Sequence, residues 1–473
     1  MKQRIQLNEH FTYGKLLRFA LPSIIMMIFT SVYGVVDGLF VSNYVGKTAF
    51  ASVNLIMPFI ICTGAIGFML GTGGSAIVGK TLGEGDREKA NRYFSMLVYA
   101  TIALGVLIAI LGLVAVKPVA RLFGAEGELL DGCVTYGSIL LAFQPFFMLQ
   151  SAFQSFFATA EKTSVGLWVI VGAGLTNIWL DFVFVGILHW GIWGAALATG
   201  ISEVVGGVTP VVYFSVKNGS LLRLTKTRFY GKIFLKVCGN GSSEFLTNIS
   251  SAVVGMLYNF QLMKLAGEDG ISAYGVIMYV NFVFLAIFFG FSIASAPVFS
   301  YHFGADNKAE LKSLFRKSMT IVVIFGVVLA GASQLLTVPL SKLFVGDYQG
   351  LYEMTVRGMR LFAISFLVQG INIFGSAFFT ALNDGLVSAV LSFGRTLVFQ
   401  VSAVFLLPLL LGLDGIWLAV VAAELLALVV TVVFFAAKRK NTDMHETRRG
   451  VELRQNSFRF ALRISALNVI LKT

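Results

Sequence analysis

Long apolar segments, separated by short polar loops, dominate the pattern of the chain. A transmembrane helix needs about 20 consecutive apolar residues, and twelve segments satisfy this length. They cover residues 16–42, 52–78, 94–116, 133–158, 164–188, 190–214, 233–262, 271–298, 315–338, 356–380, 386–411 and 415–437. The pattern therefore predicts an all-α polytopic membrane protein with twelve transmembrane helices.

The two halves of the chain resemble each other. Ala49–Met57 matches Gly270–Met278, and Leu82–Ala90 matches Phe303–Leu311, both at an offset of 221 residues. One offset that holds across polar loops predicts two repeated six-helix bundles around a central cavity. The expected parts are an N-terminal six-helix lobe at 1–215, a cytoplasmic linker at 216–232, a C-terminal six-helix lobe at 233–440 and a basic cytoplasmic tail at 441–473.

Composition and charge agree with a membrane protein and indicate its orientation. The chain is 57% hydrophobic and 13% charged, with a net charge of +12. Lys and Arg concentrate in the loops after the second, sixth and eighth segments and at both ends of the chain. The positive-inside rule therefore places both termini in the cytoplasm, and it explains the positive charge without nucleic acid.

Enzymatic chemistry is not expected. Three cysteines and four histidines are scattered without metal-ligand spacing or a disulfide framework. No nucleophile–base pair is visible at membrane depth. We expect no cofactor and no catalytic residues.

Polar residues inside the apolar segments indicate where transport chemistry occurs. Asp37 lies on the first segment, Asn177 and Asp181 lie one helical turn apart on the fifth, and Thr199 lies on the sixth. Counting 1.5 Å per residue places all four about 10–15 Å from the outer surface. Carboxylate, amide and hydroxyl oxygens suit shared protons or a hard cation, so this set is the expected H⁺ site, or the metal site if Na⁺ is the coupling ion. Helix–helix hydrogen bonding is the alternative role for Asn177 and Thr199.

The repeat favours the coupling interpretation. At the constant offset, Asp37 corresponds to Tyr258 and Asp181 to Ser402. The acids were not duplicated with the fold, which is unexpected for residues needed only for folding. Pro22 lies in the first segment, where a proline removes a backbone hydrogen bond and allows the helix to bend.

Further charged residues within the apolar segments have two possible roles. Arg395 and Glu424 both lie near the predicted midplane, and Glu244 lies within reach of the arginine. Arg395 could pair with either glutamate and stabilise the second half. Alternatively, Glu203, Glu244 and Glu424 could line the cavity and bind a cationic substrate.

Several motifs resemble those of the multidrug and toxic compound extrusion (MATE) transporters. They are the first segment with Pro22 and Asp37, the loop Gly83–Ala90, and Gly191–Thr199 with its counterpart at 415–419. The resemblance covers residues 10–440 and is closest to the bacterial DinF-like and MepA-like branch. It implies a coupling site in the first half at Asp37, Asn177, Asp181 and Thr199, and a bend at Pro22. NorM-like members rely instead on acids of the seventh and tenth helices, and the tenth segment here, with Gln369, Asn372 and Ser376, carries no acid.

These observations predict a secondary antiporter. It would export cationic, lipophilic drugs or toxins in exchange for H⁺ or Na⁺ by alternating access, and so support xenobiotic export and antibiotic resistance. The alternative is a flippase or exporter of lipid-linked or polar metabolites in the same superfamily. We expect a monomer whose partners are small cationic molecules and the lipid bilayer.

Overall fold

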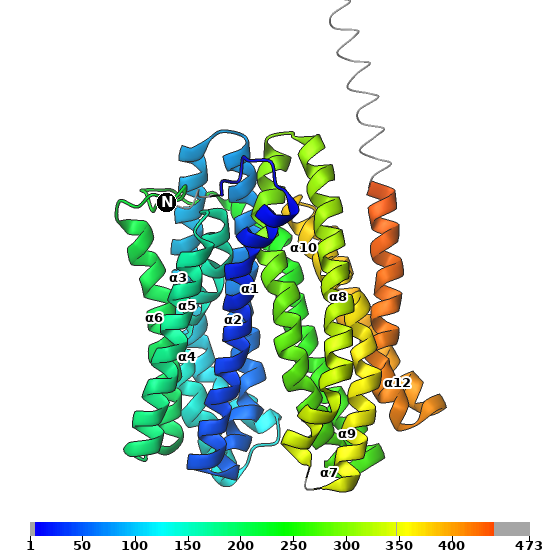
Figure 1. Ribbon diagram of the computed structural model, residues 1–473. Helices are drawn as coiled ribbons and strands as arrows, with labels where there is room; N and C mark the ends of the chain where they lie inside the picture. Colours follow the sequence, from blue (N-terminus) through cyan, green and yellow to red (C-terminus); the bar gives the residue numbers. More distant parts are fainter. Residues whose placement is uncertain (1–4, 347, 439–473) are drawn as a thin grey trace, which may run out of the picture. The chain divides into compact units, whose positions relative to one another are not determined.

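Helices account for all the regular secondary structure in the described part of the chain, residues 5–346 and 348–438 of a computed structural model (Figure 1). In chain order, with η for short π-helical or 3₁₀ segments, they are α1 (Tyr13–Phe40), η1 (Val41–Val45), α2 (Lys47–Gly83), α3 (Arg87–Leu122), α4 (Gly127–Thr159), α5 (Thr163–Asp181), η2 (Phe182–Ile187), α6 (Gly191–Ser215), α7 (Gly231–Gly304), α8 (Lys308–Val345), α9 (Gln349–Phe362), η3 (Ala363–Ser365), α10 (Phe366–Ala381), α11 (Gly385–Phe393), η4 (Gly394–Phe399) and α12 (Gln400–Leu411). A last helix covers Leu413–Lys438. The described residues up to Ala427 form one compact unit and those from Leu428 a second. The predicted tail at 441–473 lies outside the described residues.

Eleven helices in the described ranges are long and apolar enough to cross a membrane. One of them, α7, has 74 residues, which corresponds to about 110 Å at 1.5 Å per residue. That is far longer than one crossing of a ~30 Å hydrocarbon core. Helical geometry breaks inside α7 at Gly267, where φ is 62°. Counted on both sides of this break, the helices give the predicted twelve crossings, and the chain is a multi-pass membrane protein.

The helices of the compact unit lie side by side in two groups (Figure 1). In the first lobe, defined as α1 to α6, α4 packs against α2, α3 and α6, and α5 packs against α1 and α6. In the second lobe, defined as α7 to Ala427, α7 and α8 pack against α10, and α7 also packs against α11. Helices α1 and α2 contact α7, so the first half of each lobe forms the junction between them.

Equivalent turns of the two lobes use the same capping chemistry. The Asp86 carboxylate accepts a hydrogen bond from the backbone N–H of Lys89 at the start of α3. Asn307, 221 positions later, accepts one from the N–H of Glu310 at the start of α8. Such caps satisfy donors that a helix start leaves without partners. The sequence repeat is therefore also a repeat of local structure.

The lobes meet closely where the ends of α2 and α7 come together. A Cβ added at Gly83 would lie 1.9 Å from the carbonyl oxygen of Tyr301, and one at Gly304 would lie 2.0 Å from that of Lys80. One turn earlier, a Cβ at Gly79 would lie 2.3 Å from Ser300 Oγ. Only glycine permits this backbone approach. We call this region the closed end.

The connection between the lobes is attached to the first lobe. It runs from residue 216 to residue 230 without regular structure and lies along α3. The guanidinium of Arg87 donates to the carbonyl of Ser220 at 2.8 Å, and the N–H of Arg223 donates to Asn91 at 2.8 Å. Tyr230 packs edge-to-face on Tyr93 immediately before α7 begins. The connection is therefore held on the first lobe up to the start of α7, where Val237 also packs into the apolar core of that lobe.

Candidate functional site

Three helices of the first lobe carry the predicted coupling residues. Asp37 lies in the last turn of α1, Asn177 and Asp181 lie in the last two turns of α5, and Thr199 lies in α6. A π-helical segment follows directly after Asp181. Such segments shift the register of side chains and occur frequently at functional sites. The side chains of Asp37, Asn177 and Asp181 are buried.

The structure brings these residues together around the Thr199 hydroxyl. Thr199 Oγ1 lies 3.3 Å from Asp37 Oδ1 and 3.1 Å from the carbonyl oxygen of Ala195 as potential acceptors. It accepts a hydrogen bond from Asn177 Nδ2 at 3.4 Å. The depth estimate from helix rise thus identified residues that do meet in space. We call Asp37, Asn177, Asp181 and Thr199 the acid cluster.

The two carboxyl groups of the acid cluster lie within electrostatic reach of each other. Neither oxygen of Asp181 has a donor among the described residues, and its side chain is fully buried. The Asn177 carbonyl oxygen is likewise buried without a partner. Two neighbouring buried carboxylates, one of them without any donor, are unstable when both are charged. The donor set fits a proton shared between the acids or a small hard cation bound by their oxygens.

Other polar residues around the acid cluster were not predicted. Tyr136 of α4 is fully buried, its hydroxyl has no partner among the described residues, and it lies next to Thr199 and Asp37. Tyr33 lies one turn before Asp37 and contacts Gln150. Gln150, a polar residue inside the apolar helix α4, could have indicated from the sequence that this part of α4 faces the acid cluster. Spacing on α1 could likewise have identified Tyr33, but no sequence feature identified Tyr136.

Glu203 lies one turn beyond Thr199 on α6. Its side chain is 8% exposed, its Oε2 atom has no donor in the described part of the chain, and it lies within electrostatic reach of Asp37. No Lys or Arg of α1 to α6 is buried. The first lobe therefore contains three buried acids and no buried basic side chain to compensate them.

Pro22 lies within α1, which remains helical from Tyr13 to Phe40. Near it the lobes approach closely, because a Cβ at Gly290 of α7 would lie 2.5 Å from Cα of Ile24. About 22 Å of helix separates Pro22 from Asp37 at 1.5 Å per residue. A bend at the proline would thus move the end of α1 that carries the acid.

The buried charges of the second lobe are compensated. Arg395 Nη1 lies 3.4 Å from Glu424 Oε1, with side chains 13% and 7% exposed. Asn372 Nδ2 donates to Glu424 Oε2 at 2.7 Å. Glu244 lies within electrostatic reach of Arg395, but the ion pair is formed with Glu424. This geometry favours a stabilising ion pair, rather than substrate binding, as the role of Arg395 and Glu424.

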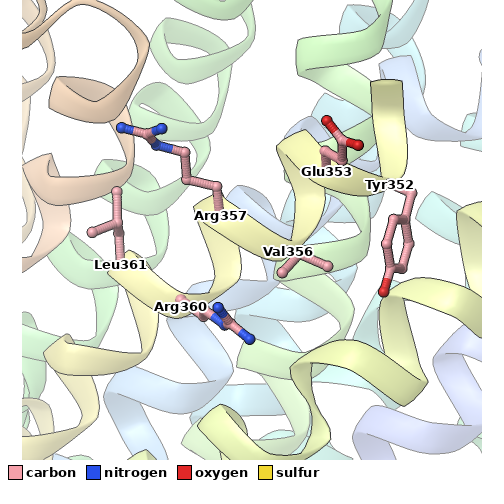
Figure 2. A pocket seen from close by; sticks show the side chains of 6 residues that line it. All are labelled: Tyr352, Glu353, Val356, Arg357, Arg360 and Leu361. Carbon is pink, nitrogen blue, oxygen red and sulfur yellow. The ribbon is translucent and has the colours of Figure 1, made fainter. Parts of the chain in front are cut away.

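An open cavity of about 440 Å³ lies along α9 (Figure 2). It is lined by Tyr352, Glu353, Val356, Arg357, Arg360 and Leu361. Arg357 pairs with Asp414 at 2.7 Å through its Nε atom. All lining residues come from one helix of the second lobe, so this cavity is separate from the acid cluster.

No group of three or more His, Cys, Asp or Glu residues in the described ranges could hold a metal ion. The acid cluster does not count as such a group, because only two of its four residues are acids and the others supply an amide and a hydroxyl. It could bind a monovalent cation only through this mixed set of oxygens.

The chain matches the MatE family twice, over residues 22–183 and 245–406, once in each lobe. It is 25% identical over 450 residues to the multidrug export protein MepA of Staphylococcus haemolyticus, covering 93% of this chain and 97% of the relative. A crystal structure of MATE in complex with MaL6 shares the fold, with a TM-score of 0.87, 23% identity, and coverage of 93% of this chain and 98% of that one. An outward-facing multidrug resistance MATE transporter of the MOP superfamily gives a TM-score of 0.86 at 23% identity and the same coverage. Two matches that together cover more than half of the sequence show that the chain belongs to the MatE family.

Proposed function

We propose that the protein is a multidrug antiporter that exports lipophilic cations in exchange for H⁺ or Na⁺. The observation that carries this proposal is the acid cluster, where Asp181 is buried without a donor and faces Asp37. The multidrug export named for the staphylococcal relatives supports the substrate class. The protein would act as a monomer in a bacterial inner membrane, with both termini in the cytoplasm.

The acid cluster would act as the ion-dependent part of the transport cycle. A proton or Na⁺ between Asp37 and Asp181 removes repulsion between two buried carboxylates. The ion can drive transport only if its binding free energy differs between the two conformations. This requires that the acid cluster has a different geometry in each. Ion binding would shift α1 relative to α5 and α6, and Pro22 would allow α1 to bend.

Glu203 would hold the positive centre of the substrate. Its carboxylate is buried without full compensation, and Tyr33 lies within its electrostatic reach. An aromatic face beside an acid suits a bulky organic cation through cation–π contact. Because Glu203 is also within reach of Asp37, ion binding at the acid cluster would weaken the attraction for a second positive charge. No observation favours the alternative lipid-linked or polar substrate, since the buried arginine of the second lobe is already paired.

Efflux of ethidium from proteoliposomes under an imposed proton gradient, then under a sodium gradient, tests the proposal. We expect transport under at least one gradient and its loss in Asp37→Asn. Asp131→Asn is the matched control, because Asp131 is an exposed acid of the same lobe. Glu203→Gln should raise the ethidium concentration needed for half-maximal efflux by roughly tenfold, which is the loss of one charge-assisted contact. Gradient-driven transport by Asp37→Asn at the rate of the control would refute the coupling role.

A further inference from the structure

A short segment before α1 contacts both lobes at the closed end. It comprises residues 6–12 and is called the strap here. Leu7 and Phe11 are its apolar anchors, and both side chains are fully buried. The strap precedes the first predicted crossing, so membrane insertion does not account for burial of these two residues.

One end of the strap is bound to the first lobe. The N–H of Leu7 donates to Glu161 Oε1 at 2.7 Å. Glu161 lies in the turn between α4 and α5, where it adopts a positive φ of 57°. A carboxylate that accepts from a backbone N–H makes a charge-assisted hydrogen bond, about twice as strong as a neutral one.

The other end of the strap is bound to the second lobe. The Glu310 carboxylate at the start of α8 accepts from the N–H of Phe11 at 2.9 Å and lies 2.6 Å from Nδ1 of His10. The Lys317 ammonium donates to the carbonyl oxygen of Phe11. The buried ring of His302, at the end of α7, lies beside the backbone of Leu7 and Glu9. Three side chains of the second lobe, from α7 and α8, therefore hold the strap.

These contacts lie where the glycines of α2 and α7 bring the lobes together. Leu7, Phe11 and Phe19 belong to the same apolar cluster as residues of α7 and α8, such as Phe299 and Leu314. A rocking motion that separates the lobes at the closed end must break the strap's bonds on one side. The acid cluster takes no part in these contacts.

We propose that the strap is a latch that bridges Glu161 of the first lobe to Glu310 of the second and holds the closed end shut. The inference rests on alternating access as proposed above. Because the strap continues directly into α1 of the first lobe, loss of the Glu310 contacts detaches it from the second lobe, whereas loss of Glu161 only loosens its hold on the first. The strap thus sets the equilibrium between the two conformations from a position remote from the ion site.

Thiol labelling tests the latch without any transport measurement. Cys62, Cys133 and Cys238 are replaced by alanine, and Ser300→Cys places a thiol between α2 and α7, at a side chain that is fully buried. In nanodiscs, a water-soluble maleimide then reports opening of the closed end. Glu310→Ala should accelerate labelling by roughly tenfold, which corresponds to the loss of one charge-assisted hydrogen bond. Glu161→Ala should accelerate it less, because α1 still holds the strap to the first lobe.

The matched control is Glu9→Ala. Glu9 belongs to the strap, but among the described residues its carboxylate bonds only to Gln6 in the strap and Lys15 at the start of α1. The hydrogen bond from Lys15 is the main reason that the pKa of Glu9 is lowered, so it is a charged acid in neutral solution. Its removal should leave the labelling rate unchanged.

The double variant Glu310→Ala/Glu161→Ala distinguishes a bridge from two separate stabilising contacts. A bridge predicts labelling no faster than in Glu310→Ala, because a strap detached from the second lobe no longer depends on its anchor at Glu161. Multiplied rates in the double variant, or labelling of Glu310→Ala at the rate of Glu9→Ala, would overturn the proposal. If Glu310→Ala does not fold, Lys317→Ala tests the same anchor, because the Lys317 ammonium donates to the carbonyl oxygen of Phe11. If Glu310→Ala labels faster as expected but the protein does not export ethidium, the proposed function is refuted and the latch is not.

Discussion

The buried pair of Arg395 and Glu424 permits a quantitative prediction about the second lobe. The two side chains are 13% and 7% exposed and lie 3.4 Å apart. Glu424 has a second bond from Asn372 at 2.7 Å, so its carboxylate keeps one donor when the arginine is removed. The perturbation is Arg395→Ala, which leaves a buried carboxylate with an amide donor as its neighbour.

Breaking a buried ion pair typically costs about 3–5 kcal/mol of unfolding free energy. The separation here exceeds the 2.7–2.9 Å of the strongest charged hydrogen bonds, and Asn372 remains. We therefore expect the lower end, about 3 kcal/mol, for Arg395→Ala. Adding Glu424→Gln removes the charge left behind, so the double variant should lose at least about 1 kcal/mol less than the two single losses combined.

Unfolding in mixed micelles with increasing SDS measures these free energies. Arg357→Ala is the control, because Arg357 pairs with Asp414 but its side chain is 70% exposed, and exposed pairs contribute about 0–1 kcal/mol. The cycle with Glu244→Gln should show weaker coupling, since Glu244 is near Arg395 without forming the ion pair. Additive losses for Arg395→Ala and Glu424→Gln would refute the pairing argument, as would a loss no larger than that of Arg357→Ala.

Two further predictions concern motion of the first lobe. Pro22→Ala restores a backbone hydrogen bond in α1, so it should stiffen the helix and slow ethidium turnover several-fold with little change in ethidium binding. Turnover equal to that of the unmodified protein would show that bending at the proline does not limit the cycle. Gly83→Ala places a Cβ 1.9 Å from a carbonyl oxygen of α7, so it should separate the helices and accelerate labelling at the closed end. Gly331→Ala is its control, because nothing lies within 4 Å of a Cβ there, and equal labelling of these two glycine variants would contradict the close contact.

Helix positions followed from hydropathy because a membrane span leaves a long, simple signal. The break in α7 at Gly267 falls in the gap at 263–270 between the seventh and eighth predicted segments. Lys264, Glu268 and Asp269 indicated a loop between the seventh and eighth spans. The chain nevertheless stays helical on both sides and departs from helical geometry at Gly267. Glycine accepts this conformation without the steric cost that other residues bear, so the turn needs far fewer residues than a polar loop suggests.

Residues of the acid cluster could be found from sequence because helix rise converts position into depth. Polar residues at one depth on neighbouring helices are candidates for contact, and Asp37, Asn177 and Thr199 do meet. Depth does not give rotation about the helix axis. It therefore could not choose between Glu244 and Glu424 as the partner of Arg395, and it did not identify Tyr136. The strap was missed for a different reason: seven residues before a helix carry no periodic pattern.

The two lobes differ in how they compensate buried charge, and this difference bears on which lobe responds to the ion. In the second lobe, Arg395 and Asn372 neutralise and bond Glu424 within the protein itself. An added cation would have to displace an existing partner there. In the first lobe, Asp181 has no donor in the described ranges and faces Asp37, so a proton or Na⁺ would supply what the protein does not. A gradient can act only on a site whose stability depends on the ion, and the acid cluster, unlike the paired charges of the second lobe, meets this condition of the proposed mechanism.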